Sequence, residues 1–339
     1  MMEAFNHHRP ENVENAVALL RRNGTSACII AGGTDLVGCL KDRLWLEQPE
    51  SVVDVKGIPG LNAITRDGDS LRVGALATLT EIAESELVRA ICPGLSEAAR
   101  RTASPLLRNM GTLGGNICQE NRCWYYRYPD RLGGMIPCVR KGGAKCLAVP
   151  GDNRYHSIFG AVNKCIAVNP SDTAPALSAL DATIVTSERS IPVDAFFCAE
   201  RGKQSTVLEH GEIVLEIVIP GHSLRLENNG FAVKSLFKKL AFRKSIDFAL
   251  VNCALCLGIA EGKVARARMC LNGVYNNPYR PVEAEEFLAG RELNEAIAIE
   301  AAELALQKAK PLPGNAYKVN LAKSLVADVL MGRVCCSHH

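Results

Sequence analysis

Two glycine-rich segments are the first candidates for chemistry in this chain. One reads Ala-Gly-Gly-Thr-Asp over residues 31–35, and the other reads Asn-Met-Gly-Thr-Leu-Gly-Gly-Asn over residues 109–116. Glycine lets the backbone approach a phosphate closely and turn its N–H groups toward it. Neither segment has the G-x-G-x-x-G pattern of a Rossmann dinucleotide site or the G-x-x-x-x-G-K-[ST] pattern of a P-loop. The pair therefore predicts two groups of N–H donors that hold the two phosphates of one cofactor.

A cluster of cysteines follows the second glycine segment. Its members are Cys118, Cys123, Cys138, Cys146 and Cys165. Clustered thiolates are soft ligands that suit an iron–sulfur cluster or zinc. The spacing is not the compact C-x-x-C-x-x-C of ferredoxins, so spacing alone leaves both kinds of metal site open. Another pair, Cys335 and Cys336, lies beside the terminal histidines and has no role that the sequence can assign.

Composition restricts the class of protein. With 339 residues, 47% of them hydrophobic, the chain exceeds a usual single core, so we expect two or three subdomains. The net charge of +3 is too small to indicate binding to nucleic acid or an anionic membrane. No segment offers the roughly 20 consecutive apolar residues of a membrane span. Residues 1–9 also lack the apolar stretch of a secretory signal. The sequence therefore predicts a cytoplasmic protein.

The elements that would position the first glycine segment form a small β-α-β unit. Apolar residues at helical spacing predict a helix that starts at Pro10 and stops at Asn23-Gly24. A strand then runs to Ile30, and a second strand covers residues 51–55. Helices at 80–84 and 95–103 precede the second glycine segment.

The elements after the cysteines alternate between helices and strands. Ser171 or Asp172 is expected to cap a helix that continues through residue 180. Further strands are predicted at 182–186, 213–219, 249–259 and 265–274, and helices at 282–288, 297–309 and 319–330. A domain boundary is expected around residues 221–230, where Pro, Gly, Asn and charged residues concentrate.

The chain resembles the FAD-binding medium subunits of the molybdenum hydroxylases, the family of xanthine dehydrogenase and carbon monoxide dehydrogenase. The matching motifs occur in order: AGGTDL at 31–36, VGALAT at 73–78, GTLGGN at 111–116, NPSDTAPALSALDA at 169–182, FKKLAFRKSIDFALV at 237–251 and LNGV at 271–274. The resemblance implies an α+β fold. An FAD-binding domain of two α/β subdomains (PCMH type) would precede a C-terminal α/β domain of the CO dehydrogenase flavoprotein type. The expected division is 1–57, 58–228 and 229–334.

Site residues carry over from this resemblance position by position. The FAD pyrophosphate and ribityl chain would lie on Ala31, Gly32, Gly33, Thr34 and Asp35, with Asn109, Thr112, Gly115 and Asn116 from the second loop. Asp172 would accept a hydrogen bond from a cofactor hydroxyl, leaving Ser171 as the helix cap. Lys238 matches a family lysine near the isoalloxazine ring, where a cation would stabilise reduced flavin. The alternative for Lys238 is an ordinary surface lysine.

Residues 117–168, here called the cysteine insert, distinguish the chain from shorter flavin subunits. They are similar to the insert of 4-hydroxybenzoyl-CoA reductase and of some periplasmic aldehyde oxidoreductases, which houses an extra [4Fe–4S] cluster. The matching positions are Cys123, Cys138, Cys146 and Cys165, which leaves Cys118 as a spare thiol. A nearby FAD favours an iron–sulfur cluster over zinc, because a redox cluster can exchange electrons with a flavin and zinc cannot.

The implied function is electron transfer within a larger complex, with no catalytic residue in this chain. A large molybdopterin (molybdenum cofactor) subunit and a small subunit with two [2Fe–2S] centres would be the partners, in a heterotrimer or a dimer of heterotrimers. Electrons would pass between those centres and an external carrier through FAD and the [4Fe–4S] cluster. The alternatives are a stand-alone FAD oxidoreductase that uses NAD(P)H and a zinc-stabilised non-catalytic subunit. The sequence leaves open the substrate, the carrier and the direction of electron flow.

Overall fold

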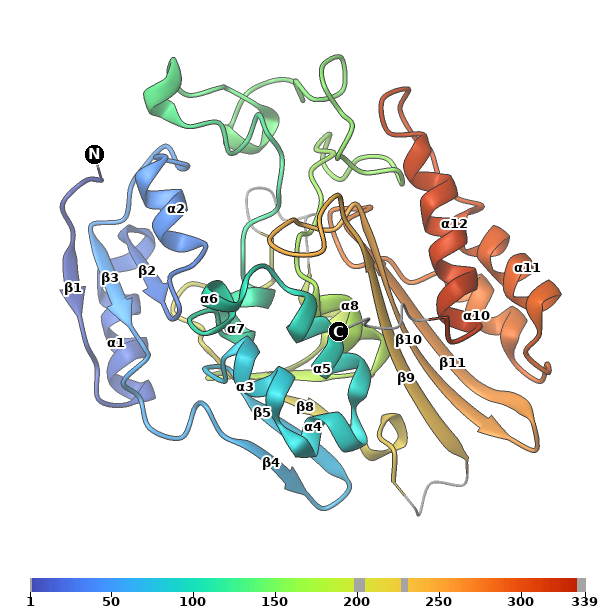
Figure 1. Ribbon diagram of the computed structural model, residues 1–339. Coiled ribbons are helices and arrows are strands. Elements are labelled where there is room, and N and C mark those ends of the chain that lie inside the picture. The colour runs from blue at the N-terminus through green and yellow to red at the C-terminus, as the bar shows by residue number, and fades with distance from the viewer. Residues whose placement is uncertain (1, 198–204, 227–230, 334–339) are drawn as a thin grey trace.

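The computed structural model describes residues 2–197, 205–226 and 231–333 (Figure 1). The mixed α/β fold expected from the sequence is confirmed, in three sheets that each have their own helices. The Cys335–Cys336 pair and part of the expected boundary at 221–230 lie outside the described residues. No helix among the described residues is long and apolar enough to cross a membrane.

The N-terminal sheet positions the first glycine segment. Its elements are β1 (Asn6–His8), α1 (Val13–Asn23), the 3-10 turn η1 (Gly24–Ser26), β2 (Ala27–Ile30), α2 (Leu36–Lys41) and β3 (Ser51–Asp54). The strands are parallel in the order β1-β3-β2, which confirms the predicted β-α-β unit. The first helix starts at Val13 rather than Pro10, because the Asn12 side chain caps it by accepting the N–H of Asn15 at 2.8 Å.

A five-stranded antiparallel sheet and a group of helices form the middle of the chain. Its elements up to the cysteine insert are β4 (Ile64–Asp67), β5 (Ser70–Gly74), α3 (Leu79–Glu84), α4 (Glu86–Ile91), α5 (Pro93–Arg101), α6 (Pro105–Arg108) and α7 (Leu113–Ile117). The elements after the insert are α8 (Thr173–Ala179), β6 (Thr183–Thr186), β7 (Ser190–Pro192), α9 (Val193–Phe196), β8 (Val214–Ile219) and the 3-10 turn η4 (Gly221–Ser223). The strand order is β4-β5-β8-β6-β7.

The cysteine insert has little regular structure of its own. Its described helical elements are the 3-10 turns η2 (Asp130–Leu132) and η3 (Val139–Lys141). In Figure 1 it is the green segment that extends from α2 to the C-terminal helices. At one end, the Asp130 N–H donates to the Asp42 carbonyl at 3.2 Å. At the other end, the Tyr317 hydroxyl donates to the Arg154 carbonyl at 3.0 Å.

The C-terminal sheet is covered by helices on both faces. Its elements are β9 (Ala232–Leu240), β10 (Val251–Ala260), β11 (Lys263–Asn272), α10 (Val282–Leu288), α11 (Glu295–Leu306) and α12 (Tyr317–Leu330), with the strands antiparallel in the order β11-β10-β9. Alternate residues of β10 belong to different cores. Cys253 and Leu255 pack with α11 and α12, whereas Ala254 and Cys256 pack with the middle of the chain. Burial on both faces explains the unbroken apolar sequence of this strand.

Candidate functional site

The two glycine segments meet backbone to backbone. The first connects β2 to α2, and the second connects α6 to α7. A Cβ atom on Gly32 would overlap the carbonyl oxygen of Met110, so only glycine permits this approach. Gly33 has φ +69°, a backbone conformation that glycine adopts without strain. Two N–H groups of the second segment, those of Leu113 and Gly114, are fixed by carbonyl oxygens of residues 77 and 75 at 2.9 and 2.8 Å.

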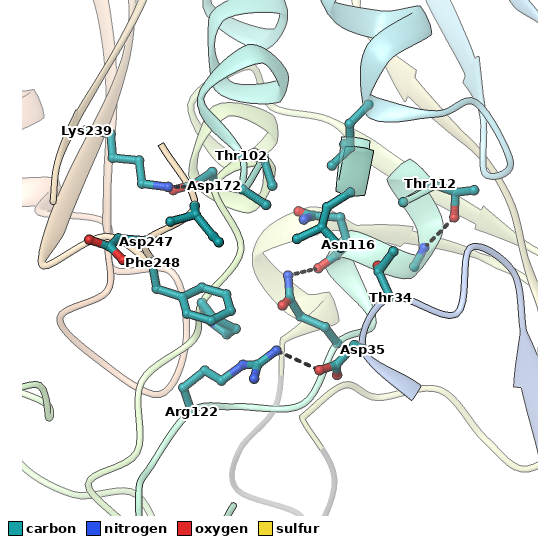
Figure 2. Close-up of a pocket in the computed structure, with 18 residues that line it drawn as sticks. Thr34, Asp35, Thr102, Thr112, Asn116, Arg122, Asp172, Lys239, Asp247 and Phe248 are labelled. Atoms are coloured by element: carbon teal, nitrogen blue, oxygen red, sulfur yellow. Dashed lines mark hydrogen bonds and ion pairs between the residues drawn. The ribbon is translucent and has the colours of Figure 1, made fainter. Parts of the chain in front are cut away.

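Three adjoining hollows surround this contact, and Thr112 lines all of them. The main cavity lies between the glycine segments, α8, β9 and the β9–β10 loop at residues 241–250 (Figure 2). The hollow of the first loop is lined by residues 31–35 together with Cys118. The hollow of the second loop includes Asn109 and Met110. Every predicted cofactor residue except Lys238 lines at least one of the three hollows. The name glycine-loop cavity is used below for all three together.

The structure gives Lys238 a different partner from the one expected. Its Nζ atom donates to Asp328 Oδ2 on α12 at 2.6 Å and to the Arg333 carbonyl at 2.9 Å. Successive side chains of a strand point to opposite faces, so the neighbour Lys239 is the one that lines the main cavity. The sequence motif contains both lysines, and the register of β9 decides which of them faces the cavity.

Lys239 and Asp172 form a buried ion pair in the main cavity. Lys239 Nζ lies 2.5 Å from Asp172 Oδ2, and the side chains are 6% and 2% exposed. Asn252 donates to the other carboxylate oxygen at 2.7 Å. Burial raises the pKa of Asp172, although Lys239 and Asn252 act in the opposite direction. Each carboxylate oxygen keeps a further lone pair, so Asp172 can still accept a hydrogen bond from a ligand hydroxyl.

Ser171 acts as the helix cap, as predicted. Its Oγ accepts the N–H of Ala174 at 2.9 Å, and no cap hydrogen bond is made by the Asp172 side chain. The same hydroxyl donates to Asn116 Oδ1 at 2.5 Å, as does the Thr173 hydroxyl at 2.7 Å. Because Asn116 Oδ1 accepts hydrogen bonds from these two hydroxyls, the NH₂ group of the same amide is available to donate into the cavity.

Asp35 connects the first glycine segment to the cysteine insert. Its carboxylate lies 2.6 Å from Arg122 Nη2 and 2.8 Å from Arg127 Nη1, and it accepts the Glu120 N–H at 3.1 Å. Burial alone would raise the pKa of Asp35, but the two guanidinium groups hold it below its ordinary value. The two arginines therefore compensate for the negative charge that Asp35 brings to the first glycine segment.

Arg122 also reaches the main cavity. Its guanidinium carbon lies 4.3 Å from the centre of the Phe248 ring, a cation–π contact, and both residues line the cavity (Figure 2). The Nε atom is buried without a hydrogen-bond partner among the described residues, and burial lowers the pKa of Arg122 to about 10. A partly buried guanidinium with one unsatisfied N–H group is suited to an anionic or carbonyl-bearing ligand.

The four cysteines predicted as metal ligands lie near one another. Cys123 and Cys138 pack in one small apolar cluster with Cys39 and Tyr126. Burial raises the pKa of the Cys123 thiol to about 12, and the thiolates of Cys165 and Cys138 act in the same direction. Cys146 and Cys138 act in the same way on Cys165. The fifth thiol, Cys118, lies apart and is exposed beside the first glycine segment.

Cations and N–H donors surround these thiols. Lys141 is buried, and its Nζ atom has no hydrogen-bond partner among the described residues. Burial lowers the pKa of Lys141, against the effect of the Cys138 and Cys123 thiolates. The Ala167 N–H lies 3.5 Å from Cys165 Sγ, and His156 Nε2 lies 3.1 Å from Cys123 Sγ. No three His, Cys, Asp or Glu side chains in the described parts of the chain are close enough to hold a single metal ion.

Comparison with known families identifies the chain. Residues 3–222 match the FAD-binding domain of molybdopterin dehydrogenases, and residues 235–332 match the C-terminal domain of CO dehydrogenase flavoproteins. The chain belongs to the FAD-binding medium subunits of the molybdenum hydroxylase family.

Relatives and solved structures cover the chain from end to end. The aldehyde oxidoreductase FAD-binding subunit PaoB of Escherichia coli is 33% identical over 97% of this chain and 98% of its own length. The CO dehydrogenase medium chain of Hydrogenophaga pseudoflava is 28% identical over 96% of each chain. A CO dehydrogenase structure from the same organism superposes with a TM-score of 0.74, at 26% identity over 99% of this chain and all of its own.

In this medium subunit, the sequence analysis missed cavity residues that lie far in sequence from the two glycine segments. Lys239 depends on strand register, and Phe248 enters the cavity from the β9–β10 loop. Arg122 and Arg127 come from the insert and meet Asp35 across more than eighty residues. The charge of Asp35 was the available signal, because a partly buried carboxylate requires a cationic partner.

Proposed function

We propose that this medium subunit transfers electrons through bound FAD within a heterotrimeric molybdenum-dependent oxidoreductase, or a dimer of such heterotrimers. The supporting observation is the backbone contact between the two glycine segments, with three adjoining hollows that share Thr112. N–H groups of residues 31–35, with that of Thr112, would hold the pyrophosphate, because the N–H groups of residues 113–115 already donate within the chain. Bound FAD would interconvert one-electron and two-electron transfer.

The chain's own residues would orient the flavin and adjust its charge. The Asn116 NH₂ group and the Asp172 carboxylate are available to polar atoms of the cofactor. Lys239, rather than Lys238, would supply the cation beside the reduced ring, because it lies in the main cavity. The Phe248 ring, backed by Arg122, would cover one side of the cavity and limit access of water.

The proposal includes a [4Fe–4S] cluster on Cys123, Cys138, Cys146 and Cys165. Burial raises the pKa of the Cys123 and Cys165 thiols, and a bound metal makes such thiols ionise. The unpartnered Lys141 ammonium would compensate for the negative charge of four thiolates. The N–H donor at Cys165 would stabilise its thiolate in the same way. A zinc site on the same thiols is the second candidate, since thiolates also bind zinc, but it would require the thiols to move closer, because no three described ligands can hold a single ion.

The partners follow from the same proposal. The related proteins are named as a medium chain of CO dehydrogenase and a subunit of an aldehyde oxidoreductase. A large molybdopterin subunit would carry out the reaction on the substrate, and a small subunit with two [2Fe–2S] centres would connect it to FAD. The external carrier would exchange electrons with this chain, in a complex located in the cytoplasm.

Metal and flavin analysis of the purified complex and of the separate chain tests the proposal. We expect about one FAD and about four irons per copy of this chain beyond those of its partners. Cys123→Ser or Cys146→Ser should remove that iron and retain FAD, while the control Cys118→Ser retains both. Zinc in place of iron would contradict the electron-transfer role of the insert, and a preparation without FAD would contradict the main proposal.

A further inference from the structure

A second concave surface lies beside the glycine-loop cavity and is strongly basic. Its volume is about 640 Å³. It is called the arginine groove below, and its lining comes from α4, α5, α6 and the segment before it, the segment after η4, β9 and the β9–β10 loop. The cationic residues that line it are Arg89, Arg100, Arg101, Arg108, Arg225 and Lys244.

The charge of the arginine groove is nearly all of one sign. Glu97 is the one carboxylate among the described residues that line it, and it lies 2.7 Å from Arg101 and 3.7 Å from Arg100. Six cations therefore face one anion, whereas the entire chain carries a net charge of only +3. Like charges in a hollow with apolar walls focus the field and attract anions.

Several of these cations have no anionic partner in the part of the chain that the structure describes. Arg89, Arg225 and Lys244 form no ion pair with any described residue, and all three are exposed. Arg108 donates to the carbonyl oxygens of Thr102 and Ala103 at 2.9 and 3.4 Å. This contact fixes its guanidinium group without neutralising it. Holding like charges together in this way costs free energy unless an anion binds between them.

The groove and the main cavity share a wall. Ala103 lines both, and the Ile246 N–H donates to the Ala103 carbonyl at 3.0 Å. Within the β9–β10 loop, Lys244 and Ser245 face the groove, whereas residues 246–248 line the main cavity. A molecule in the groove would therefore lie against the loop that closes the proposed flavin site.

We propose that the arginine groove binds the phosphate groups of a small molecule of nucleotide size. Its volume lies within the range of small-molecule sites, and its concave shape suits a small ligand better than a flat protein surface. Planar guanidinium groups bind phosphate through paired hydrogen bonds, and five of the six cations are arginines. The inference goes beyond the proposed function and does not depend on it.

Titration calorimetry on the FAD-loaded complex, with ADP and inorganic pyrophosphate as probes, tests this inference. Arg225→Gln combined with Lys244→Gln should weaken ADP binding by about tenfold or more, because charge-assisted hydrogen bonds are lost. The matched control is Arg291→Gln with Lys310→Gln, which removes the same charge from the α10–α11 and α11–α12 connections, outside the groove lining. It should change the ADP Kd by less than about twofold.

The outcomes separate this inference from the proposed function. Tighter binding of ADP than of pyrophosphate would show that the groove recognises a nucleotide. Equal binding of the two probes would show that it recognises the phosphate groups alone. Absence of ADP and pyrophosphate binding, equal weakening in the control, or release of FAD by ADP would overturn the inference. A groove that binds only an acidic protein would overturn it as well. Loss of FAD from the chain would contradict the proposed function while the ADP titration could still succeed.

Discussion

The glycine-loop cavity and the cysteine insert are built by different means. The cavity is formed where short loops leave regular strands and helices, and backbone hydrogen bonds fix the second glycine segment at 2.8–2.9 Å. The described insert contains only two 3-10 turns, and side-chain ion pairs attach it to the first glycine segment. Replacing a glycine should therefore disrupt the cavity, because its shape is set by the backbone. Removing a charged side chain should instead loosen the insert, because ion pairs hold it in place. Asp35 is the residue at which the two regions meet.

The largest effect is expected inside the cavity, at Lys239. Lys239→Met would leave the Asp172 carboxylate buried at 2% exposure without its cation. Removing one partner of a buried pair costs about 3–5 kcal/mol in the free energy of unfolding. Lys238→Met is the control, because its partner Asp328 is 38% exposed and such pairs contribute about 1 kcal/mol or less. Urea denaturation of both variants measures the difference. Equal losses would contradict the assignment of Lys239 to the cavity.

The connection between the two regions is tested by Asp35→Asn. Arg122 and Arg127 would keep their partly buried charges without a carboxylate, at a cost of about 2–3 kcal/mol. Asp67→Asn, which breaks a pair with the exposed Arg72, should cost less than about 1 kcal/mol. We also expect lower FAD content in Asp35→Asn, because the first glycine segment loses its attachment to the insert.

The same pair predicts a dependence on pH. The pKa of Asp35 is lowered in the folded chain, so the unfolded chain binds the proton more readily as the pH falls. The stability that Asp35 contributes is therefore complete above its unfolded pKa of about 4 and is lost as the pH falls through its lower folded pKa. The difference in unfolding free energy between wild type and Asp35→Asn should shrink below about pH 4. A difference that grows with acid would contradict the ion-pair explanation.

The backbone contact of the cavity is tested by Gly32→Ala. The new methyl group would overlap the Met110 carbonyl, so the two glycine segments must separate. Overpacking of this kind costs about 2 kcal/mol in unfolding free energy, and FAD content should fall about tenfold or more. Gly38→Ala on α2 is the control, because no atom of the described residues lies within 4 Å of its added Cβ. That change should stabilise the helix by about 0.5–1 kcal/mol and retain FAD.

The two regions also differ in how far the sequence could predict them. The β-α-β unit and the glycine segments follow from local patterns, and the structure places them as expected. Lys239 could not be separated from Lys238, because one residue of strand register decides which face each occupies. The arginines at Asp35 come from an irregular segment, where no periodicity predicts the direction of a side chain. The domain limits 57, 228 and 334 and the four-cysteine ligand set stay predictions.

The smallest effect is expected for Ser171→Ala, which tests whether Ser171 only caps α8 or also positions a cofactor ligand. Ser171→Ala removes the cap of α8 and should cost about 1 kcal/mol in unfolding free energy. It also removes one hydroxyl from Asn116 Oδ1, so the amide orientation at the cavity becomes less fixed. FAD affinity should then fall a few-fold, about the effect of one weakened hydrogen bond. Ser85→Ala removes a comparable cap on α4, where the hydroxyl accepts the Val88 N–H at 3.3 Å. If both variants lose similar stability and only Ser171→Ala loses FAD affinity, Asn116 is a cofactor ligand positioned by Ser171. Unchanged FAD affinity in Ser171→Ala would limit Ser171 to its role in the helix.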